Sequence, residues 1–150
     1  MGADQSGLIR EAVTETVIGA FYSVYNELGV GFLEQVYENA LMVCLLDAGL
    51  PVLQQQRIDV YFKGHKVGDY RADLIIPDEL LIEVKVASTI SPAHEAQLVN
   101  YLKATGVPIG LLLNFGPRPQ VKRRVHSKNP LLSAPIRSYP RSKRECSTKS

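Results

Sequence analysis

Apolar residues recur along the chain with two different periods, and these periods predict its elements. In residues 7–28 they recur every three or four positions, as on one face of a helix, and Gly29 suits the end of that helix. A second helix is expected from about Leu33 to Ala48, closed by Gly49 and Pro51. Its apolar cover is expected to come from Val36, Ala40, Val43, Leu46 and their neighbours.

Beyond residue 51 the pattern changes to that of β-strands. Residues 52–63 have a strand-like pattern, a turn at 63–66 follows, and residues 67–76 form the next strand. Residues 80–87 are expected to pair with that strand in a second hairpin. Apolar runs on both sides of the turn at 77–79 indicate that this hairpin is buried.

A third helix and one more strand complete the predicted core. Ser91 suits the N-cap and Pro92 the first position of a helix that runs from Ala93 to Thr105 and is closed by Gly106. Residues 108–115 follow as a buried strand. The order α-α-β-β-β-α-β, in which the late helix connects two strands, predicts an α/β fold with a mixed central sheet flanked by helices.

Length and composition fit one domain. The 150 residues are 45% apolar, which suffices for one sizeable core but not for two. We expect a domain over residues 1–126 and a basic, disordered tail over residues 127–150. No apolar run is long enough for a membrane span and no signal-peptide pattern is visible, so we expect a cytoplasmic protein with no membrane contact. Cys44 and Cys146 lack the paired spacing of a zinc site and are expected to be plain thiols.

The net charge of +2 hides a strong asymmetry. Residues 1–116 carry seven Lys and Arg against 14 Asp and Glu, a balance of −7, whereas residues 117–150 carry ten against one, a balance of +9. Such a basic segment can supply a salt-sensitive attraction to nucleic-acid phosphates. The alternative is a terminus that only keeps the protein in solution.

The second hairpin carries the candidate chemistry. It places Asp73 on one strand and Glu83 and Lys85 on the other, and the two-residue period puts Glu83 and Lys85 on one face with Val84 opposite. Two carboxylates there can hold a divalent cation, and the ammonium group can orient a water or stabilise charge on a phosphate. The alternative is a salt-bridged or solvated set of charges, but an unpaired charge inside apolar strands is costly.

Two helical motifs add polar candidates. Glu34 and Tyr37 lie three residues apart in the second helix, after Gly31, and Gln97 and Tyr101 lie four apart in the third. Taken singly, such residues are more often part of the core or the surface than of a site. We expect Gln97 and Tyr101 to face the cleft beside Asp73, while the four-apart pair Leu98 and Leu102 packs in the core.

Together these residues resemble a known family. The combination of Gly31-x-x-Glu34-x-x-Tyr37, Ala72-Asp73, Glu83-Val84-Lys85, Gln97 to Tyr101 and Leu112 to Gly116 is similar to the small G-x-x-E-x-x-Y proteins of the PD-(D/E)xK nuclease superfamily. The resemblance covers about residues 9–126 and implies a restriction-endonuclease-like core. Ala72 stands where the superfamily's name has Pro, which weakens the signature but removes no metal ligand.

The resemblance also implies roles for single residues. Asp73, Glu83 and Lys85 take the core catalytic positions, Glu34 assists the metal, and Gln97 and Tyr101 match a helical Q-x-x-x-Y element. The implied reaction is hydrolysis of a phosphodiester of nucleic acid, with DNA favoured over RNA. Mg²⁺ or Mn²⁺ would be held by Asp73, Glu83, the Val84 carbonyl and Glu34.

Two other functions stay open. The chain can be a nuclease-fold subunit that binds nucleic acid within a complex, with a protein partner or a second copy, since the acidic part offers little surface to DNA. Alternatively, Asp73, Glu83 and Lys85 can form a buried ion-pair network with no chemical role.

Overall fold

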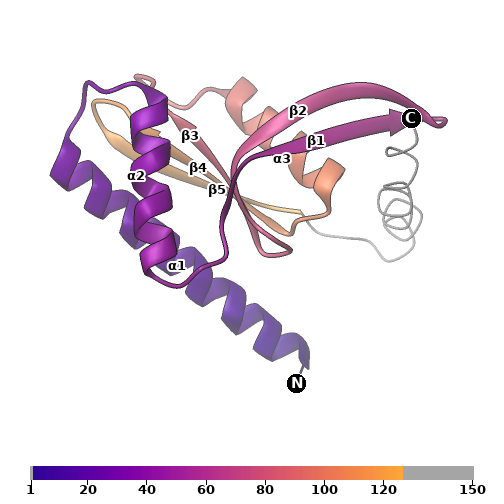
Figure 1. Ribbon diagram of the computed structural model, residues 1–150, viewed down its shortest axis with the longest axis horizontal. Helices are drawn as coiled ribbons and strands as arrows, with labels where there is room; N and C mark the ends of the chain where they lie inside the picture. The colour runs from indigo at the N-terminus through magenta and orange to yellow at the C-terminus, as the bar shows by residue number, and fades with distance from the viewer. Residues whose placement is uncertain (1, 127–150) are drawn as a thin grey trace.

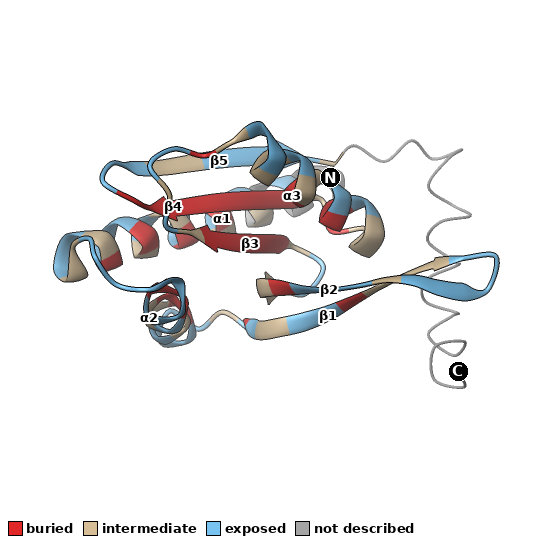
Figure 2. Cartoon of the chain, turned by 90° about the horizontal axis from the view of Figure 1, so that it is seen from above, coloured by how far each residue is buried: buried red, intermediate tan, exposed pale blue. Residues whose placement is uncertain are grey.

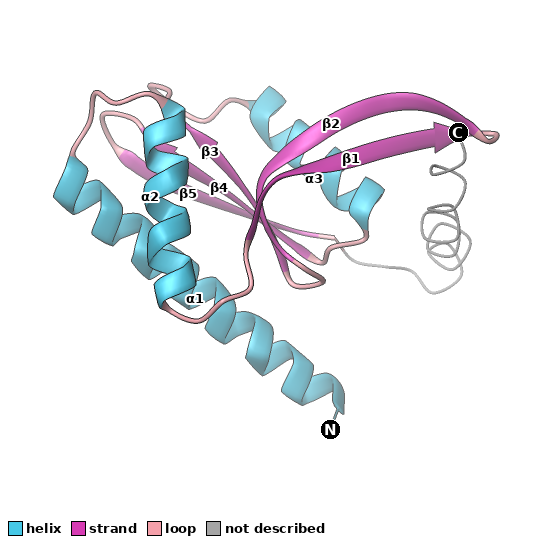
Figure 3. Cartoon of the chain, in the orientation of Figure 1, coloured by secondary structure: helices cyan, strands magenta, loops and turns pink. Residues whose placement is uncertain are grey.

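The computed structural model describes residues 2–126, and the expected tail at 127–150 lies outside the described residues. Residues 2–126 form three helices and five strands (Figures 1 and 3). In chain order these are α1 (Gly2–Leu28), α2 (Glu34–Asp47), β1 (Leu53–Phe62), β2 (His65–Ile76), β3 (Leu80–Lys85), α3 (Pro92–Thr105), β4 (Ile109–Phe115) and β5 (Pro119–Val125). None of these helices is long and apolar enough to cross a membrane.

The sheet has the order β1-β2-β3-β4-β5. β3 and β4 are parallel and are connected through α3, whereas each of the other neighbouring pairs is antiparallel. The two parallel strands lie at the centre of the sheet, where both faces are covered, and all seven residues of β4 are buried (Figure 2). The predicted mixed sheet with flanking helices is therefore confirmed.

Helices cover both faces of the sheet (Figure 1). α1 and α2 pack on one face and α3 on the other, and each face has its own apolar cluster. The larger cluster includes Val17, Phe21, Tyr37, Leu41, Leu45, Leu74, Ile82, Val84, Leu113 and Phe115. The smaller cluster, under α3, includes Ile58, Ala72, Leu81, Leu98, Tyr101, Leu102 and Leu112.

The predicted apolar cover of α2 was confirmed for Ala40, which packs against the larger cluster, but was wrong for the other three named residues. Val36, Val43 and Leu46 are 38%, 66% and 53% exposed, and the buried positions of this helix are Tyr37, Glu38, Leu41 and Leu45. Apolar residues occupy nearly every side of this helix, so the period alone does not select the inner face. Docking on the sheet selects it instead.

The predicted order lacked the last strand, β5. The observed order is α-α-β-β-β-α-β-β. β5 pairs along its whole length with β4, but it lies at the sheet edge and its burial is low. Only Val121 packs against the larger apolar cluster, so Pro119–Val125 shows no run of buried apolar residues that would predict a strand. Exposed Lys and Arg are common on edge strands because they discourage pairing with another chain.

The first two strands form a long hairpin that projects past the rest of the sheet (Figures 1 and 2). β2 pairs with β1 over almost its full length, but with β3 only at Leu74–Ile76. Beyond that point the hairpin lies on the α3 side, where Ile58 and Ala72 join the smaller cluster and the ring of Tyr70 lies 5.6 Å from that of Tyr101.

The loop between β3 and α3 is anchored by a buried amide. Asn114, which is fully buried, accepts from the Ala87 N–H and donates to the Ala87 carbonyl, both at 2.9 Å. Asn114 also donates to Gln120 Oε1, which accepts from the Ile90 N–H at 3.2 Å. Gly116 permits this close approach, because a Cβ there would lie 1.9 Å from the Ala87 carbonyl oxygen.

We predict that Gly116→Ala lowers the free energy of unfolding by about 3 kcal/mol, because the added methyl group meets backbone that cannot move without losing the Asn114 hydrogen bonds. Urea unfolding followed by circular dichroism measures this. The matched control is Gly19→Ala in α1, where a Cβ meets nothing within 4 Å. That exposed helical change should stabilise by about 0.5–1 kcal/mol. Equal effects of the two substitutions would contradict the steric account.

Candidate active site

The predicted site residues lie where β2 separates from β3. The pairs Leu74–Ile82 and Ile75–Leu81 place Asp73 opposite Glu83 at the next step of the register. There the side chains take over the hydrogen bonds of the ladder. Glu83 Oε2 accepts from the Asp73 N–H at 3.0 Å, and Asp73 Oδ2 accepts from the Val84 N–H at 2.8 Å. Each of the two carboxylates is therefore held by a backbone N–H of the opposite strand.

The sheet faces agree with the predicted alternation. Val84 belongs to the cluster under α1 and α2, while Leu81, two residues before Glu83, belongs to the cluster under α3. Glu83 and Lys85 thus share the α3 face. Glu83 is only 4% exposed, whereas Asp73 and Lys85 are half-buried.

The site gathers acidic groups whose charged forms are poorly solvated. The pKa of Glu83 is raised to about 8, mainly by burial and in addition by the nearby charge of Asp73. Burial also raises the pKa of Asp73, although the Val84 N–H, the Gln55 amide and the charge of Lys85 act in the opposite direction. Within residues 2–126 no ion pair of 4 Å or less joins Lys85 to either carboxylate. One lysine therefore compensates these charges only in part.

A third carboxylate, Glu38, belongs to this site and was not predicted. It is 3% exposed, and its Oε2 accepts from Gln54 Nε2 at 2.7 Å and from Gln55 Nε2 at 2.9 Å. Burial raises the pKa of Glu38, and the charges of Asp73 and Glu34 add to that effect. In the sequence, Glu38 lies three residues before Leu41 and seven before Leu45, which places it on the same face of the helix. It was not predicted because the wrong face of this helix was expected to be buried.

The residues of the G-x-x-E-x-x-Y motif divide between the site and the scaffold. Glu34 is exposed and accepts from the Val86 N–H at 3.3 Å, which places it just past the end of β3. Tyr37 is fully buried and stacks on Phe115 with a centroid distance of 4.3 Å. Its hydroxyl donates to the Gly29 carbonyl and accepts from the Phe32 N–H. Gly31, with φ of 111°, gives this loop a backbone conformation that favours glycine.

The third helix brings Tyr101 to the carboxylates. The pKa of Tyr101 is raised to about 12, mainly by burial and in addition by the nearby charges of Glu83 and Asp73. Leu98 and Leu102 are 0% and 1% exposed, as predicted for the packing pair. Gln97 is half-buried, and within the described chain it makes no hydrogen bond to Asp73, Glu83 or Lys85. A role for Gln97 stays a prediction.

The donor set fits a divalent cation in part. In residues 2–126 no group of three or more His, Cys, Asp and Glu side chains is arranged to hold a metal ion. The close pair is Asp73 and Glu83, so further ligands would have to be backbone carbonyls, waters or substrate oxygens. The raised pKa values of Glu38, Asp73 and Glu83 indicate carboxylates that would gain from a positive charge among them.

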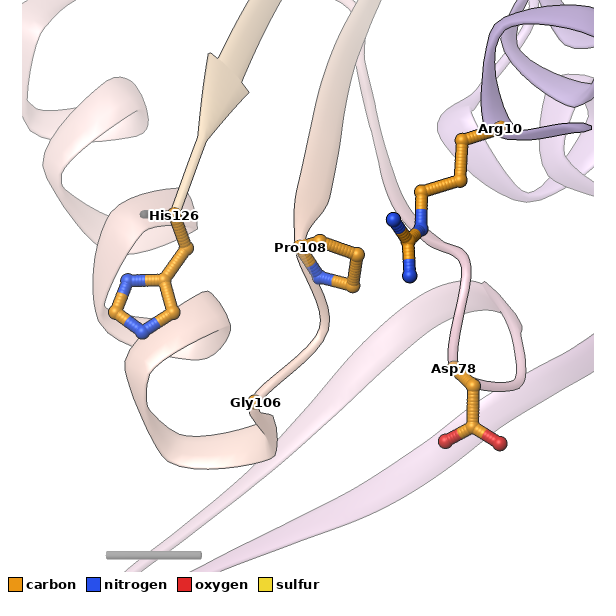
Figure 4. Close-up of a pocket in the computed structure, with 5 residues that line it drawn as sticks. All are labelled: Arg10, Asp78, Gly106, Pro108 and His126. Carbon is orange, nitrogen blue, oxygen red and sulfur yellow. The ribbon is translucent and has the colours of Figure 1, made fainter. Parts of the chain in front are cut away.

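A pocket of about 390 Å³ lies elsewhere, lined by Arg10, Asp78, Gly106, Pro108 and His126 (Figure 4). Gly106 and Pro108 precede β4 and Asp78 precedes β3, so the pocket lies at the opposite end of these strands from Glu83 and Lys85. In Figure 4, Arg10 and His126 lie on opposite sides of Pro108. The pocket therefore contains none of the predicted site residues.

The sequence profile of the PD-(D/E)XK nuclease superfamily matches residues 11–125. This range begins within α1, ends with β5 and includes the opposed pair Asp73 and Glu83. The chain belongs to the PD-(D/E)XK nuclease superfamily.

The fold is also similar to that of a solved structure, described as the crystal structure of SSO0001, with a TM-score of 0.50 and 18% sequence identity. The similarity covers 71% of this chain and 56% of that one, so this chain spans little more than half the length of SSO0001. At this identity the likeness concerns the fold alone. No curated protein matches this chain.

We predict that, without added metal, the stability of the protein falls as pH rises from about 4.5 to about 8. In this range the folded protein holds a proton on Glu83 that the unfolded chain has released, since the pKa is near 4.5 unfolded and about 8 folded. The slope from one such group is at most about 1.4 kcal/mol per pH unit. Thermal unfolding across this range measures it.

The matched variant for this prediction is Glu83→Gln, which keeps the shape of the side chain and cannot ionise. Its slope should be smaller, with the remainder due to Asp73 and Glu38, and at pH 8 it should be at least as stable as wild type. A purely structural ion-pair network predicts the reverse, because a lost partner then leaves Lys85 uncompensated. Marked destabilisation of this variant at pH 8 would support that alternative.

Proposed function

We propose that this protein is a metal-dependent nuclease of the G-x-x-E-x-x-Y type that hydrolyses phosphodiester bonds in DNA. The observation that carries the proposal is the pair Asp73 and Glu83, which face each other beside Lys85 where two strands of a PD-(D/E)XK fold separate. Buried carboxylates with raised pKa values and one nearby lysine are an arrangement that favours binding of a cation.

In this proposal Asp73, Glu83 and the Val84 carbonyl would hold Mg²⁺ or Mn²⁺, with Glu34 assisting from the rim beside Val86. The bound ion supplies polarisation of the scissile phosphate and a more acidic water. Lys85, on the same face as Glu83, orients that water and offsets negative charge on the phosphate. With a pKa of about 12, Tyr101 stays protonated at neutral pH and can donate a hydrogen bond to the nucleic-acid backbone, and Gln97 is proposed to assist it.

A second candidate is a nuclease-fold subunit that binds DNA within a complex, with a protein partner or a second copy. It is favoured by the charge of the domain. When β5 is included, residues 1–126 carry 11 Lys and Arg against 14 Asp and Glu, a balance of −3. A negative domain attracts a polyanion weakly by itself.

We predict that the wild-type protein binds Mn²⁺ in a calorimetric titration and cleaves DNA only with Mg²⁺ or Mn²⁺ present. Asp73→Asn should weaken Mn²⁺ binding by more than about 10- to 100-fold, the usual effect of losing a residue outside the ligand shell. Its cleavage should be lost while its fold, checked by circular dichroism, remains. Metal binding without cleavage by the pure protein would favour the subunit. Absence of both metal binding and cleavage would overturn the nuclease proposal.

We further propose that residues 127–150, which lie outside the described residues, strengthen DNA binding without selecting its sequence. This segment carries six Lys and Arg against one Glu. Truncation after His126 should weaken binding and flatten the slope of log K against log salt by about 0.9 for each phosphate no longer neutralised. Fluorescence anisotropy over a salt series measures this, with Mn²⁺ affinity as the unchanged control. An unaltered slope would show that the binding surface lies elsewhere.

A further inference from the structure

Gln55 has an unusual backbone conformation for its place in the fold. Within residues 2–126, residues other than glycine have positive φ at Gln55 (54°), Lys63 (50°) and Asp78 (66°). Lys63 and Asp78 lie in the turns that follow β1 and β2, where such values are common. Gln55 lies inside β1, where a left-handed conformation costs free energy and interrupts the ladder.

The interruption falls directly beside the candidate site. Gln54 pairs with Leu74 and Gln56 with Ala72, but the intervening pair of Gln55 with Asp73 is not formed. Asp73 in turn faces Glu83 on the next strand, at the step where β2 and β3 separate. Gln55, Asp73 and Glu83 therefore occupy one row across β1, β2 and β3, and the backbone pairing is open on both sides of Asp73.

The left-handed conformation determines where the Gln55 amide goes. Successive residues of a strand normally point to opposite faces, yet the amides of Gln54 and Gln55 both donate to Glu38 Oε2, at 2.7 Å and 2.9 Å. The Gln55 Nε2 also donates to Asp73 Oδ1 at 3.3 Å. Both N–H bonds of this amide are thus used, one on each carboxylate.

We propose that Gln55 is a positioning residue that fixes Asp73 by bridging it to Glu38, and that its strained backbone is retained for this purpose. Asp73 then has a donor on each oxygen, Gln55 on Oδ1 and the Val84 N–H on Oδ2, so its rotation is restricted from both sides. Glu38 is itself fixed by Gln54. The inference rests on the proposed function only in that Asp73 is the residue worth positioning.

The test is Gln55→Gly, which removes the amide and suits positive φ. Relief of the backbone strain and loss of the two amide hydrogen bonds act on the melting temperature in opposite directions, so the readouts that decide the test are local. The Val84 amide proton, whose acceptor is Asp73 Oδ2, should exchange with solvent at least about tenfold faster in NMR measurements without metal. The amide of Leu113 in buried β4 should exchange as in wild type. Mn²⁺ affinity should fall about 10- to 100-fold, as on loss of a residue that orients a ligand.

Gln54→Ala is the matched control, since Gln54 contacts Glu38 but not Asp73. It should leave Val84 exchange at the wild-type rate. The proposal is overturned if Gln55→Gly leaves the exchange rate of the Val84 amide unchanged. It is also overturned if the Leu113 amide exchanges faster by the same factor, because Gln55 would then stabilise the sheet as a whole and not Asp73 in particular. Absence of Mn²⁺ binding or cleavage in wild type would instead count against the nuclease function, and the exchange measurement would still decide the role of Gln55.

Discussion

The structure depends above all on how buried carboxylates are tolerated where β2 leaves β3. Glu83 and Glu38 are almost fully buried, and the raised pKa values of these two groups and of Asp73 reflect the cost of charging them there. What makes the arrangement tolerable is a set of donors: two backbone N–H groups and two glutamine amides. These donors exist because both sheet ladders beside Asp73 are open. The same opening releases the β1–β2 hairpin toward α3, where Tyr70 meets Tyr101.

Much of the remaining structure keeps the surroundings of this opening fixed. Tyr37 ties the loop before α2 to the helix and stacks on Phe115, which holds α2, and with it Glu34 and Glu38, over the end of β4. On the other face, Asn114 and Gln120 hold the loop that follows Lys85, and Gly116 allows that loop to approach. Residues outside the candidate site thus determine where the carboxylates lie.

The position of β5 changes the interpretation of the charge. The basic segment beginning at Pro117 is not simply a tail, because Lys122, Arg123 and Arg124 lie on an edge strand. Arg123 pairs with Glu11 of α1 at 3.5 Å, and Arg124 pairs with Glu95 of α3 at 3.0 Å. Part of the positive charge of β5 is therefore offset by glutamates on the helices of both faces of the sheet. Exposed pairs of this kind contribute little to stability. They do reduce the positive charge that the domain can offer to a nucleic acid.

The sequence by itself determined the elements with strong local signals and the identity of the central pair. Seven of the described elements follow from apolar periods, caps and turns, because these patterns depend on neighbours within one or two turns of chain. Asp73, Glu83 and Lys85 were singled out because charged groups in apolar strands are conspicuous, whereas Tyr101 was singled out through the resemblance to a family. Tertiary structure alone decided the inner face of α2, and with it Glu38, because that helix is apolar on most sides. Tertiary structure also decided that Pro119–Val125 forms a strand, because an edge strand is stabilised by pairing with its neighbour and carries little apolar pattern of its own. It decided the left-handed conformation of Gln55 as well. No local signal marks that residue, because its conformation is set by carboxylates on a helix and on another strand.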